Sequence, residues 1–304
     1  MIDRACISLT SKCQLCCTYC HFDKHIDKKS CEDLKSESLK GILQNISEYA
    51  YKNGISFKIG LVGAGEPLIR FDLIQESVTF LSEIDADENI SLYTISNGIY
   101  CTPEIMKFFF DNQNRIKLCF SLDGNPDIHN ACRKFKNGAP SFEKVWTTIE
   151  LYEKYFGKMP SVNATVHRKT FQNADVVLQF FEENFSEVTF SRLVDEQSPE
   201  LFITKEEFKF FMEKAKQTKL ELRQCRLPKK YDCTMYGQLC GVGRTNIFYA
   251  DGKIYPCGRF IRKEKFVLGR EGDSLFEIEK NIKQLTPSKD GDCYFDKNIL
   301  EAGK

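Results

Sequence analysis

The feature that most constrains the fold is a repeated alternation of short β-rich segments with longer amphipathic segments. The patterns predict helices over residues 36–53, 70–84, 103–112, 141–156, 173–184 and 204–217. The strands are predicted over residues 5–10, 57–62, 90–95, 116–121, 161–166 and 188–193. Strand–helix alternation repeated six times is typical of a parallel sheet that closes fully or partly into a barrel. We therefore expect an α/β fold, a partial (β/α)6 barrel similar to a TIM barrel.

The pattern changes near residue 220. The remaining segment is rich in glycine turns, contains a hairpin-like stretch around Asp251 and Gly252, and holds many of the cysteines. The sequence therefore predicts two domains, a barrel over 1–220 and a small C-terminal domain over 221–304.

Charge and hydropathy limit the partners of the chain. The 304 residues include 43 basic and 43 acidic side chains, so nucleic acid and anionic membranes are not expected as main partners. No apolar run is long enough to span a bilayer, and the N-terminus lacks the apolar region of a secretory signal. We expect a cytoplasmic protein, with no peptide-recognition domain ahead of the first strand.

The chain has 14 cysteines, an unusual number for a reducing compartment, where grouped thiols more often bind metal than form disulfides. Five scattered ones are expected to be small buried side chains: Cys6, Cys31, Cys101, Cys119 and Cys132. The others form two groups: Cys13, Cys16, Cys17 and Cys20 near the N-terminus, and Cys225, Cys233, Cys240, Cys257 and Cys293 in the last third.

Four loops directly follow predicted strands, where the sites of parallel α/β barrels form. They read CQLCCTYC over 13–20, GAGEP over 63–67, SNG over 96–98 and SLDG over 121–124. Each of the last three alone is also a common turn sequence. Their shared position on one face of the barrel indicates a common site.

The first loop resembles the cluster motif of the radical S-adenosylmethionine (SAM) superfamily. Cys13, Cys17 and Cys20 have the C-x3-C-x2-C spacing of that family. The resemblance implies that they hold three irons of a [4Fe–4S] cluster, leaving the fourth iron open for SAM. It also places Tyr19 beside the adenine. Cys16 creates a second possible register with Cys13 and Cys20.

The other loops resemble the same family in the same order, over about residues 1–195. GAGEP is similar to the GGEP element that binds the SAM amino group, with Ala64 replacing a glycine. The resemblance assigns SAM contacts to Gly63, Gly65, Glu66, Ser96, Asn97, Ser121, Asp123 and Arg133.

Structural alternatives remain for each motif. The N-terminal cysteines with His21 or His25 also suit a structural zinc ion. Gly63 and Gly65 also suit a tight turn, Asp123 a helix cap, and Arg133 a solvated surface position.

The second cysteine group resembles the start of the SPASM extension, which carries auxiliary clusters in radical SAM peptide-modifying enzymes. Cys240 and Cys257 frame a C-x11-G-x4-C pattern, but the dense cysteine run of a full SPASM region is absent. The sequence is closer to the shorter twitch variant, with one auxiliary [4Fe–4S] cluster on Cys233, Cys240, Cys257 and Cys293. A zinc ion with four cysteine ligands would use the same residues.

The resemblance implies an enzyme that cleaves SAM to a 5′-deoxyadenosyl radical, which abstracts hydrogen from a peptide or protein, with a flavodoxin or ferredoxin as electron donor. A twitch-type dehydrogenase of small molecules and a non-catalytic zinc-binding module are the alternatives. Sulfatase-maturating enzymes place an aspartate directly after the cysteine of the YPC motif. Here that position is Gly258, so oxidation of a sulfatase Ser or Cys is not expected unless another acid takes the role.

Overall fold

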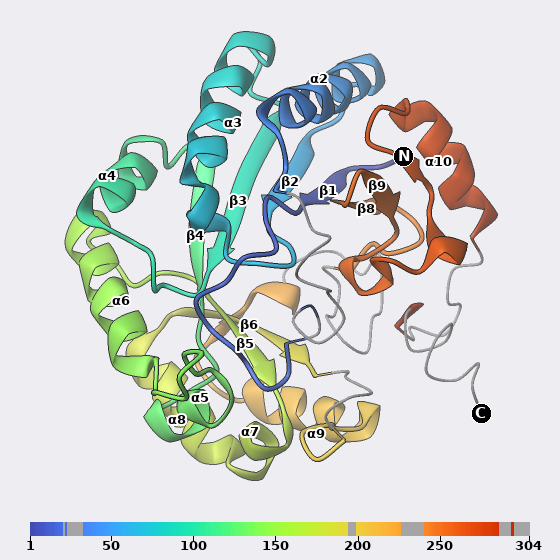
Figure 1. The fold of residues 1–304 in the computed structure, drawn as a ribbon. Coiled ribbons are helices and arrows are strands. Elements are labelled where there is room, and N and C mark those ends of the chain that lie inside the picture. Colours follow the sequence, from blue (N-terminus) through green and yellow to red (C-terminus); the bar gives the residue numbers. More distant parts are fainter. Residues whose placement is uncertain (21, 23–32, 194–198, 226–239, 286–292, 295–304) are drawn as a thin grey trace.

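Among the residues that the structure describes, ten strands form one sheet in the order β10-β9-β8-β1-β2-β3-β4-β5-β6-β7. The structure, a computed structural model, describes residues 1–20, 22, 33–193, 199–225, 240–285 and 293–294 (Figure 1). Strands β1 to β7 follow one another in chain order and pair in parallel. They are β1 (Arg4–Ile7), β2 (Phe57–Leu61), β3 (Ile90–Ser96), β4 (Ile116–Ser121), β5 (Val162–Val166), β6 (Glu187–Arg192) and β7 (Glu221–Leu222).

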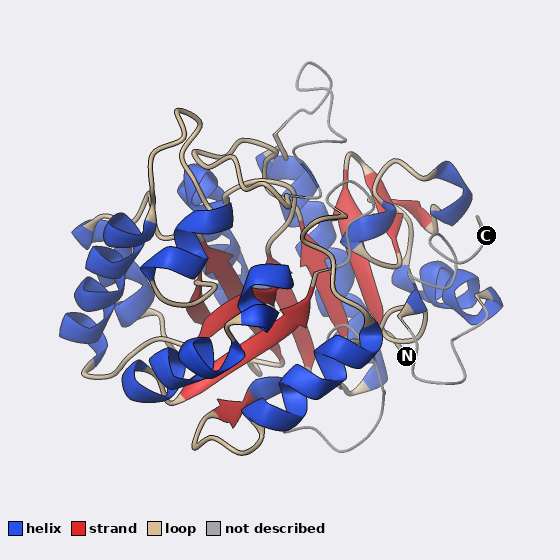
Figure 2. Ribbon diagram, turned by 90° about the horizontal axis from the view of Figure 1, so that it is seen from below, coloured by secondary structure: helices blue, strands red, loops and turns tan. Residues whose placement is uncertain are grey.

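Helices cover the outer side of this curved sheet, as Figures 1 and 2 show. They are α2 (Ser36–Asn53), α3 (Phe71–Ile84), α4 (Pro103–Asp111), α5 (Pro126–Cys132), α6 (Phe142–Phe156), α7 (Arg168–Gln172), α8 (Ala174–Asn184) and α9 (Lys205–Ala215), with 3-10 turns η1 (Pro67–Arg70) and η2 (Arg223–Cys225). The expected α/β class and partial barrel are confirmed, because parallel strands in chain order form a curved sheet with helices on its outer side.

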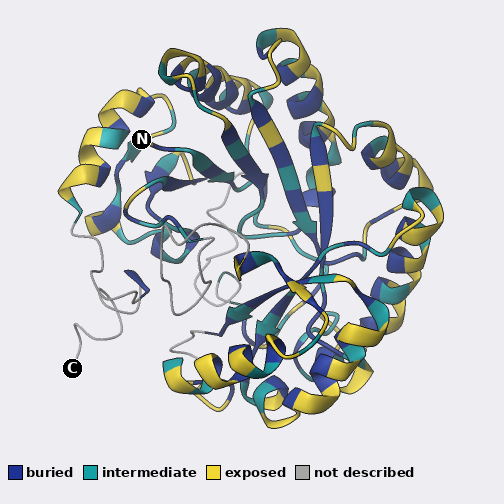
Figure 3. Cartoon of the chain, turned by 180° about the vertical axis from the view of Figure 1, so that it is seen from behind, coloured by how far each residue is buried: buried dark blue, intermediate teal, exposed yellow. Residues whose placement is uncertain are grey.

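Each long helix is held on the sheet by an apolar stripe. In α2, Leu39, Ile42, Leu43 and Ile46 recur at the spacing of one helical face, and all four are buried. Figure 3 shows the same division around the barrel, with buried positions toward the strands and exposed positions toward solvent. Fully burying a side chain of this size contributes about 1.5–3 kcal/mol.

The C-terminal segment joins the barrel sheet by a parallel pairing of β8 (Asn246–Ala250) with β1. The predicted hairpin is present: β9 (Lys253–Tyr255) returns antiparallel to β8, and the turn residues Asp251 and Gly252 both have positive φ. The remaining elements are β10 (Gly269–Arg270), the 3-10 turns η4 (Gly258–Phe260) and η5 (Glu264–Phe266), and α10 (Leu275–Gln284). The domain boundary at residue 220 stays a prediction.

Polar contacts also hold the C-terminal segment against the start of the chain. The N-terminal ammonium of Met1 lies 3.1 Å from Glu279 Oε1 on α10, and Asn45 Nδ2 on α2 donates to the carbonyl of Asp273 over 2.6 Å. Among the described residues, no helix is both long and apolar enough to cross a membrane.

Candidate active site

A cavity of about 460 Å³ lies at the carboxyl edge of the parallel strands, a volume within the range of small-molecule sites. The loops that follow β1 to β4 all contribute to its wall. The sequence-predicted residues that line it are Cys13, Cys17, Tyr19, Cys20, Gly63, Gly65, Glu66, Asn97, Ser121 and Arg133. Ser96 and Asp123 do not line the cavity. Both are fully buried behind it and hold residues that do.

The cysteine loop is fixed by backbone hydrogen bonds to the end of α5 and to the residues just after it. The Cys16 N–H donates to the carbonyl of Lys134 over 2.8 Å, and the Thr18 N–H donates to that of Cys132 over 3.0 Å. Cys13, Cys17 and Cys20 line the cavity, whereas Cys16 is exposed and is not part of its wall. This arrangement favours the register of Cys13, Cys17 and Cys20 over the one that uses Cys16.

The glycines of the second loop allow it to approach the first strand and the cysteine loop closely. An added Cβ at Gly63 would lie 2.6 Å from Ser8 Cα, and one at Gly65 would lie 2.8 Å from the Lys12 nitrogen. The Glu66 N–H donates to the Lys12 carbonyl over 2.8 Å. Neither glycine has positive φ, so neither is needed for an unusual backbone conformation. Glycine is needed at both positions because a side chain would collide with the neighbouring backbone.

Glu66 joins the second loop to the third. Its Oε1 accepts from Ser96 Oγ over 2.8 Å, and its Oε2 accepts from the Asn97 N–H over 2.7 Å. Asn97 Nδ2 in turn lies 3.5 Å from Cys13 Sγ. Burial raises the pKa of Glu66 to about 7, although these hydrogen bonds act in the opposite direction. Glu66 therefore fixes the backbone of Asn97, whose side chain reaches the cysteine loop.

Asp123 has the same role on the other side of the cavity. Its Oδ2 accepts from Arg133 Nε over 2.9 Å and from the Tyr19 hydroxyl, and its Oδ1 accepts from the Thr165 N–H over 3.0 Å. The Arg133 guanidinium also lies 5.5 Å from the centre of the Tyr19 ring. Burial alone would raise the pKa of Asp123, but the charge of Arg133 and the neighbouring groups bring it below its ordinary value.

These contacts exclude two of the structural alternatives. The cap of α5 is Asn125, whose side chain accepts from the Ile128 N–H, so Asp123 is not a helix cap. The Arg133 side chain is only 12% exposed and is paired with Asp123, so it is not a solvated surface arginine.

The donor set suits an iron–sulfur cluster. Three thiols share one cavity wall. The pKa of Cys17 is raised to about 12, because the effect of burial exceeds the opposing effect of the Arg133 charge. Cluster binding at this thiol would therefore release a proton. Within the described ranges, no three His, Cys, Asp or Glu side chains are grouped as ligands of a single metal ion. The cysteines of a [4Fe–4S] cluster bind different irons and need not converge on one point. His21 and His25 of the zinc alternative lie outside the described residues.

The second cysteine group is partly described. Cys240, Cys257 and Cys293 belong to one apolar cluster built around Phe248 and Phe260. Cys233 lies outside the described residues, so the four-cysteine set remains a prediction. Cys6 on β1, expected to be a scattered buried residue, packs against the same cluster.

Further residues that the sequence did not single out also line the active-site cavity, among them Lys136, Thr165, Ser191, Arg192 and Arg259. Thr165, Ser191 and Arg192 lie near the carboxyl ends of β5 and β6, so the strand-end rule used for the first four strands would have found them. Arg259 follows Cys257 by two positions, and no local pattern indicated that it reaches the barrel.

Comparison with known families agrees with this geometry. The family described as the radical SAM superfamily matches residues 7–178, more than half of the chain. The chain is a member of the radical SAM superfamily.

The curated relatives of this radical SAM protein include sulfatase-maturating enzymes. It is 25% identical to a cysteine-type anaerobic sulfatase-maturating enzyme of Clostridium perfringens, over 90% of this chain and 79% of that enzyme. It is 26% identical to the Clostridium novyi enzyme over 57% of this chain, but spans only 46% of that enzyme. A serine-type enzyme of Bacteroides thetaiotaomicron is 27% identical over 47% of this chain and 34% of its own length.

Solved structures share the fold. Native anSMEcpe with bound AdoMet superposes with a TM-score of 0.75 at 19% identity, covering 97% of this chain and 87% of that one. BtrN in complex with AdoMet and 2-DOIA superposes with a TM-score of 0.50 at 13% identity, covering 93% of this chain and 84% of that one. Membership of the superfamily implies SAM and a [4Fe–4S] cluster as cofactors. It makes the non-catalytic zinc module untenable as a description of the whole chain.

Proposed function

We propose that this radical SAM enzyme modifies a peptide or protein substrate by hydrogen abstraction. The observation that carries the proposal is the single cavity whose wall contains the three thiols at C-x3-C-x2-C spacing together with the GAGEP loop and Arg133. Similarity to sulfatase-maturating enzymes over 90% of the chain supports a peptide rather than a small molecule as substrate.

Cys13, Cys17 and Cys20 would hold the cluster, and Gly63, Gly65, Glu66, Ser96, Asn97, Ser121, Asp123 and Arg133 would form the SAM site. When bound, these cofactors supply an electron and a 5′-deoxyadenosyl radical. The protein orients the reactants and excludes water. Glu66 fixes the backbone of Asn97, whose side chain lies against Cys13. Asp123 orients Arg133 and Tyr19 from behind the cavity wall. The guanidinium of Arg133 also offsets part of the negative charge of the Cys17 thiolate.

An auxiliary [4Fe–4S] cluster on Cys233, Cys240, Cys257 and Cys293 is part of the proposal. Its support is the apolar cluster that Cys240, Cys257 and Cys293 share, next to the active-site cavity to which Arg259 contributes. Such a cluster would accept the electron left on the substrate, and a flavodoxin or ferredoxin would reduce the SAM cluster.

The proposed reaction differs from formylglycine formation. A side chain at position 258 has no room, because a Cβ there would lie 2.8 Å from Phe248 Cε2 and 3.0 Å from its Cζ. No aspartate therefore replaces Gly258 without a shift of Phe248. The next residue, Arg259, lines the cavity, so this segment contributes a cation to the cavity wall.

Isotope transfer tests the substrate class and does not require the substrate to be identified first. Cells of the source organism lacking this enzyme are grown on deuterated medium, and their extract is separated into a peptide and protein fraction and a small-molecule fraction. Each fraction is incubated anaerobically with the reduced enzyme and unlabelled SAM. Mass spectrometry then measures deuterium in the 5′-deoxyadenosine formed.

We expect deuterated 5′-deoxyadenosine with the peptide and protein fraction, and none with the Cys13→Ala, Cys17→Ala, Cys20→Ala triple variant. Deuterium transfer only from the small-molecule fraction would contradict the proposal and support the twitch-type dehydrogenase.

A further inference from the structure

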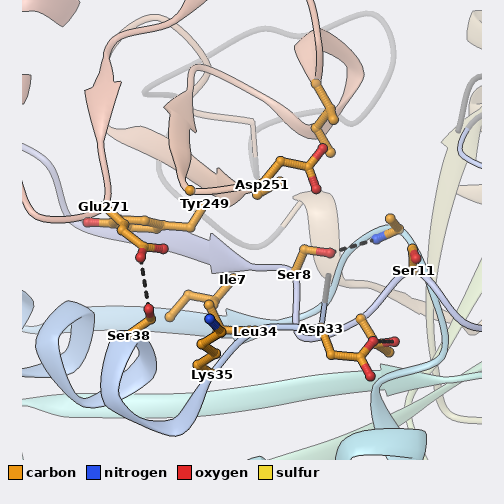
Figure 4. A pocket seen from close by; sticks show the side chains of 15 residues that line it. Ile7, Ser8, Ser11, Asp33, Leu34, Lys35, Ser38, Tyr249, Asp251 and Glu271 are labelled. Carbon is orange, nitrogen blue, oxygen red and sulfur yellow. Dashed lines mark hydrogen bonds between the residues drawn. The ribbon is translucent and has the colours of Figure 1, made fainter. Parts of the chain in front are cut away.

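A second cavity of about 400 Å³ lies on the other side of the loop that contains Ala64. Its wall combines the end of β1, the start of α2 and the β8–β9 turn, and Ser11 and Ala64 line both cavities. None of the cysteines that the structure describes lines it. Figure 4 shows Glu271, Ser38 and Tyr249 on one side of this second cavity, with Asp33 and Ser11 on the other.

The charged groups of the second cavity are mainly acidic. Asp33, Asp251 and Glu271 contribute carboxylates, and Lys35 contributes an ammonium. Asp33 already pairs with Lys12 Nζ at 2.7 Å, and Asp251 lies 3.4 Å from Arg262 Nε. These two carboxylates are therefore neutralised by the protein itself.

Glu271 differs from the other two acids. Among the described residues its carboxylate has one hydrogen-bond donor, the neutral Ser38 Oγ at 2.8 Å, and no ion-pair partner. A carboxylate that is partly removed from water is stabilised by a cation. Lys35 lines the same cavity, but among the described residues it forms no ion pair with Glu271.

Tyr249 provides an independent indication of a ligand. Its side chain lines the second cavity and is only 2% exposed, yet its hydroxyl has no hydrogen-bond partner among the described residues. Burial, followed by the charge of Glu271, raises the pKa of Tyr249 well above its ordinary value, so its hydroxyl is neutral. Buried tyrosine hydroxyls usually find a partner, and this one has an oxygen that can accept a hydrogen bond.

We propose that the second cavity binds an organic cation whose primary ammonium group is received by Glu271 and Tyr249. An ammonium has three donors and no acceptor, which matches a carboxylate and a phenolic oxygen. A single divalent ion fits less well, because no three acidic side chains among the described residues are grouped around one point. The ammonium comes either from a lysine side chain of a peptide or from a free small amine.

Isothermal titration of the cluster-loaded chain, without SAM, tests the proposal with three probes. Nα-acetyl-lysine N-methylamide represents a peptide lysine, and 1,4-diaminobutane represents a free amine. Nα-acetyl-norleucine N-methylamide is the uncharged control for the first probe. We expect one amine to bind at least about tenfold more tightly than the norleucine compound. Preference for the lysine compound identifies a peptide source, and preference for diaminobutane identifies a free amine.

Variants connect the binding to the named residues. Glu271→Gln keeps the size of the side chain and should weaken amine binding about tenfold, and Tyr249→Phe should weaken it about threefold. Glu277→Gln, an acid in the first turn of α10 that does not line the second cavity, is the matched control and should bind as the parent does. Unchanged melting temperatures would exclude misfolding as the cause.

Equal binding of the lysine and norleucine compounds, together with no binding of diaminobutane, overturns the proposal, as does full binding by Glu271→Gln. The identification of a peptide source rests on the proposed function, but the amine site itself does not. Because binding is measured without SAM or turnover, failure of the amine site and failure of the peptide reaction are separate results.

Discussion

Arg133 donates from Nε to Asp123 Oδ2 over 2.9 Å, and the acceptor carboxylate is completely buried. This ion pair joins the end of β4 to the segment after α5, and Tyr19 joins it from the cysteine loop through the same oxygen. One buried carboxylate therefore fixes two residues of the active-site wall.

Asp123→Asn should destabilise the protein, because it leaves the largely buried guanidinium of Arg133 without its countercharge. We expect the free energy of unfolding to fall by about 3 kcal/mol, measured by chemical denaturation. Asp111→Asn, which breaks an exposed pair with Lys107, should have little effect. Equal effects of the two substitutions would contradict the role of the Asp123–Arg133 pair.

Glu66 should make stability depend on pH in an unusual direction. Its pKa is raised to about 7 from 4.5, so the folded state keeps a proton that the unfolded state loses between these values. The free energy of unfolding should therefore decrease as pH rises from 4.5 to 7, by about 3 kcal/mol in the cluster-free protein. Denaturation across this range should show a much smaller decrease in Glu66→Gln. A decrease of the same size in Glu66→Gln would show that other groups cause the pH dependence.

Gly65→Ala tests the close approach of the second loop to the cysteine loop. Its Cβ would overlap the backbone of Lys12 and displace the Glu66 N–H from the Lys12 carbonyl. We expect SAM to bind about tenfold more weakly to the cluster-loaded enzyme, measured by titration calorimetry. Gly41→Ala in α2 is the control, because no atom lies within 4 Å of its Cβ. Normal SAM affinity in Gly65→Ala would show that the loop has more freedom than the structure indicates.

Gly258→Asp should not convert the enzyme into a sulfatase-maturating enzyme. The new side chain would meet the Phe248 ring, and overpacking of this kind costs about 1–3 kcal/mol. The melting temperature should fall, and an added Phe248→Leu substitution should restore part of the loss. Gly272→Asp, with open space around its Cβ, should melt close to the parent. A Gly258→Asp protein as stable as the parent would contradict this packing account.

The local parts of the fold were predictable from the sequence, and the long-range parts were not. The pattern predicted β4 at 116–121 and α2 at 36–53 with their observed bounds, because side-chain periodicity records which face of an element is buried. It did not show that β8 pairs with β1, since periodicity carries no information about the partner strand. The same pairing places Cys6 beside the second cysteine group, which the sequence did not show either.

The candidate site was predictable where motifs occur at strand ends. The loops after β1 to β4 meet in one cavity because parallel strands place their carboxyl ends at one edge. The motifs did not show which residues line the cavity and which lie behind it. Ser96 and Asp123 belong to the motifs, but they are buried and hold the side chains of Glu66 and Arg133. Arg259 lies at no strand end and carries no motif, so its place in the cavity wall was found only in the structure.

The iron, acid-labile sulfide and zinc content of the anaerobically purified chain tests the central claim most directly. We expect about eight irons per chain, falling to about four in the Cys13→Ala, Cys17→Ala, Cys20→Ala variant, since one cluster of four irons is lost. Negligible iron with one or two zinc ions per chain, as a zinc-stabilised barrel would have, would contradict it.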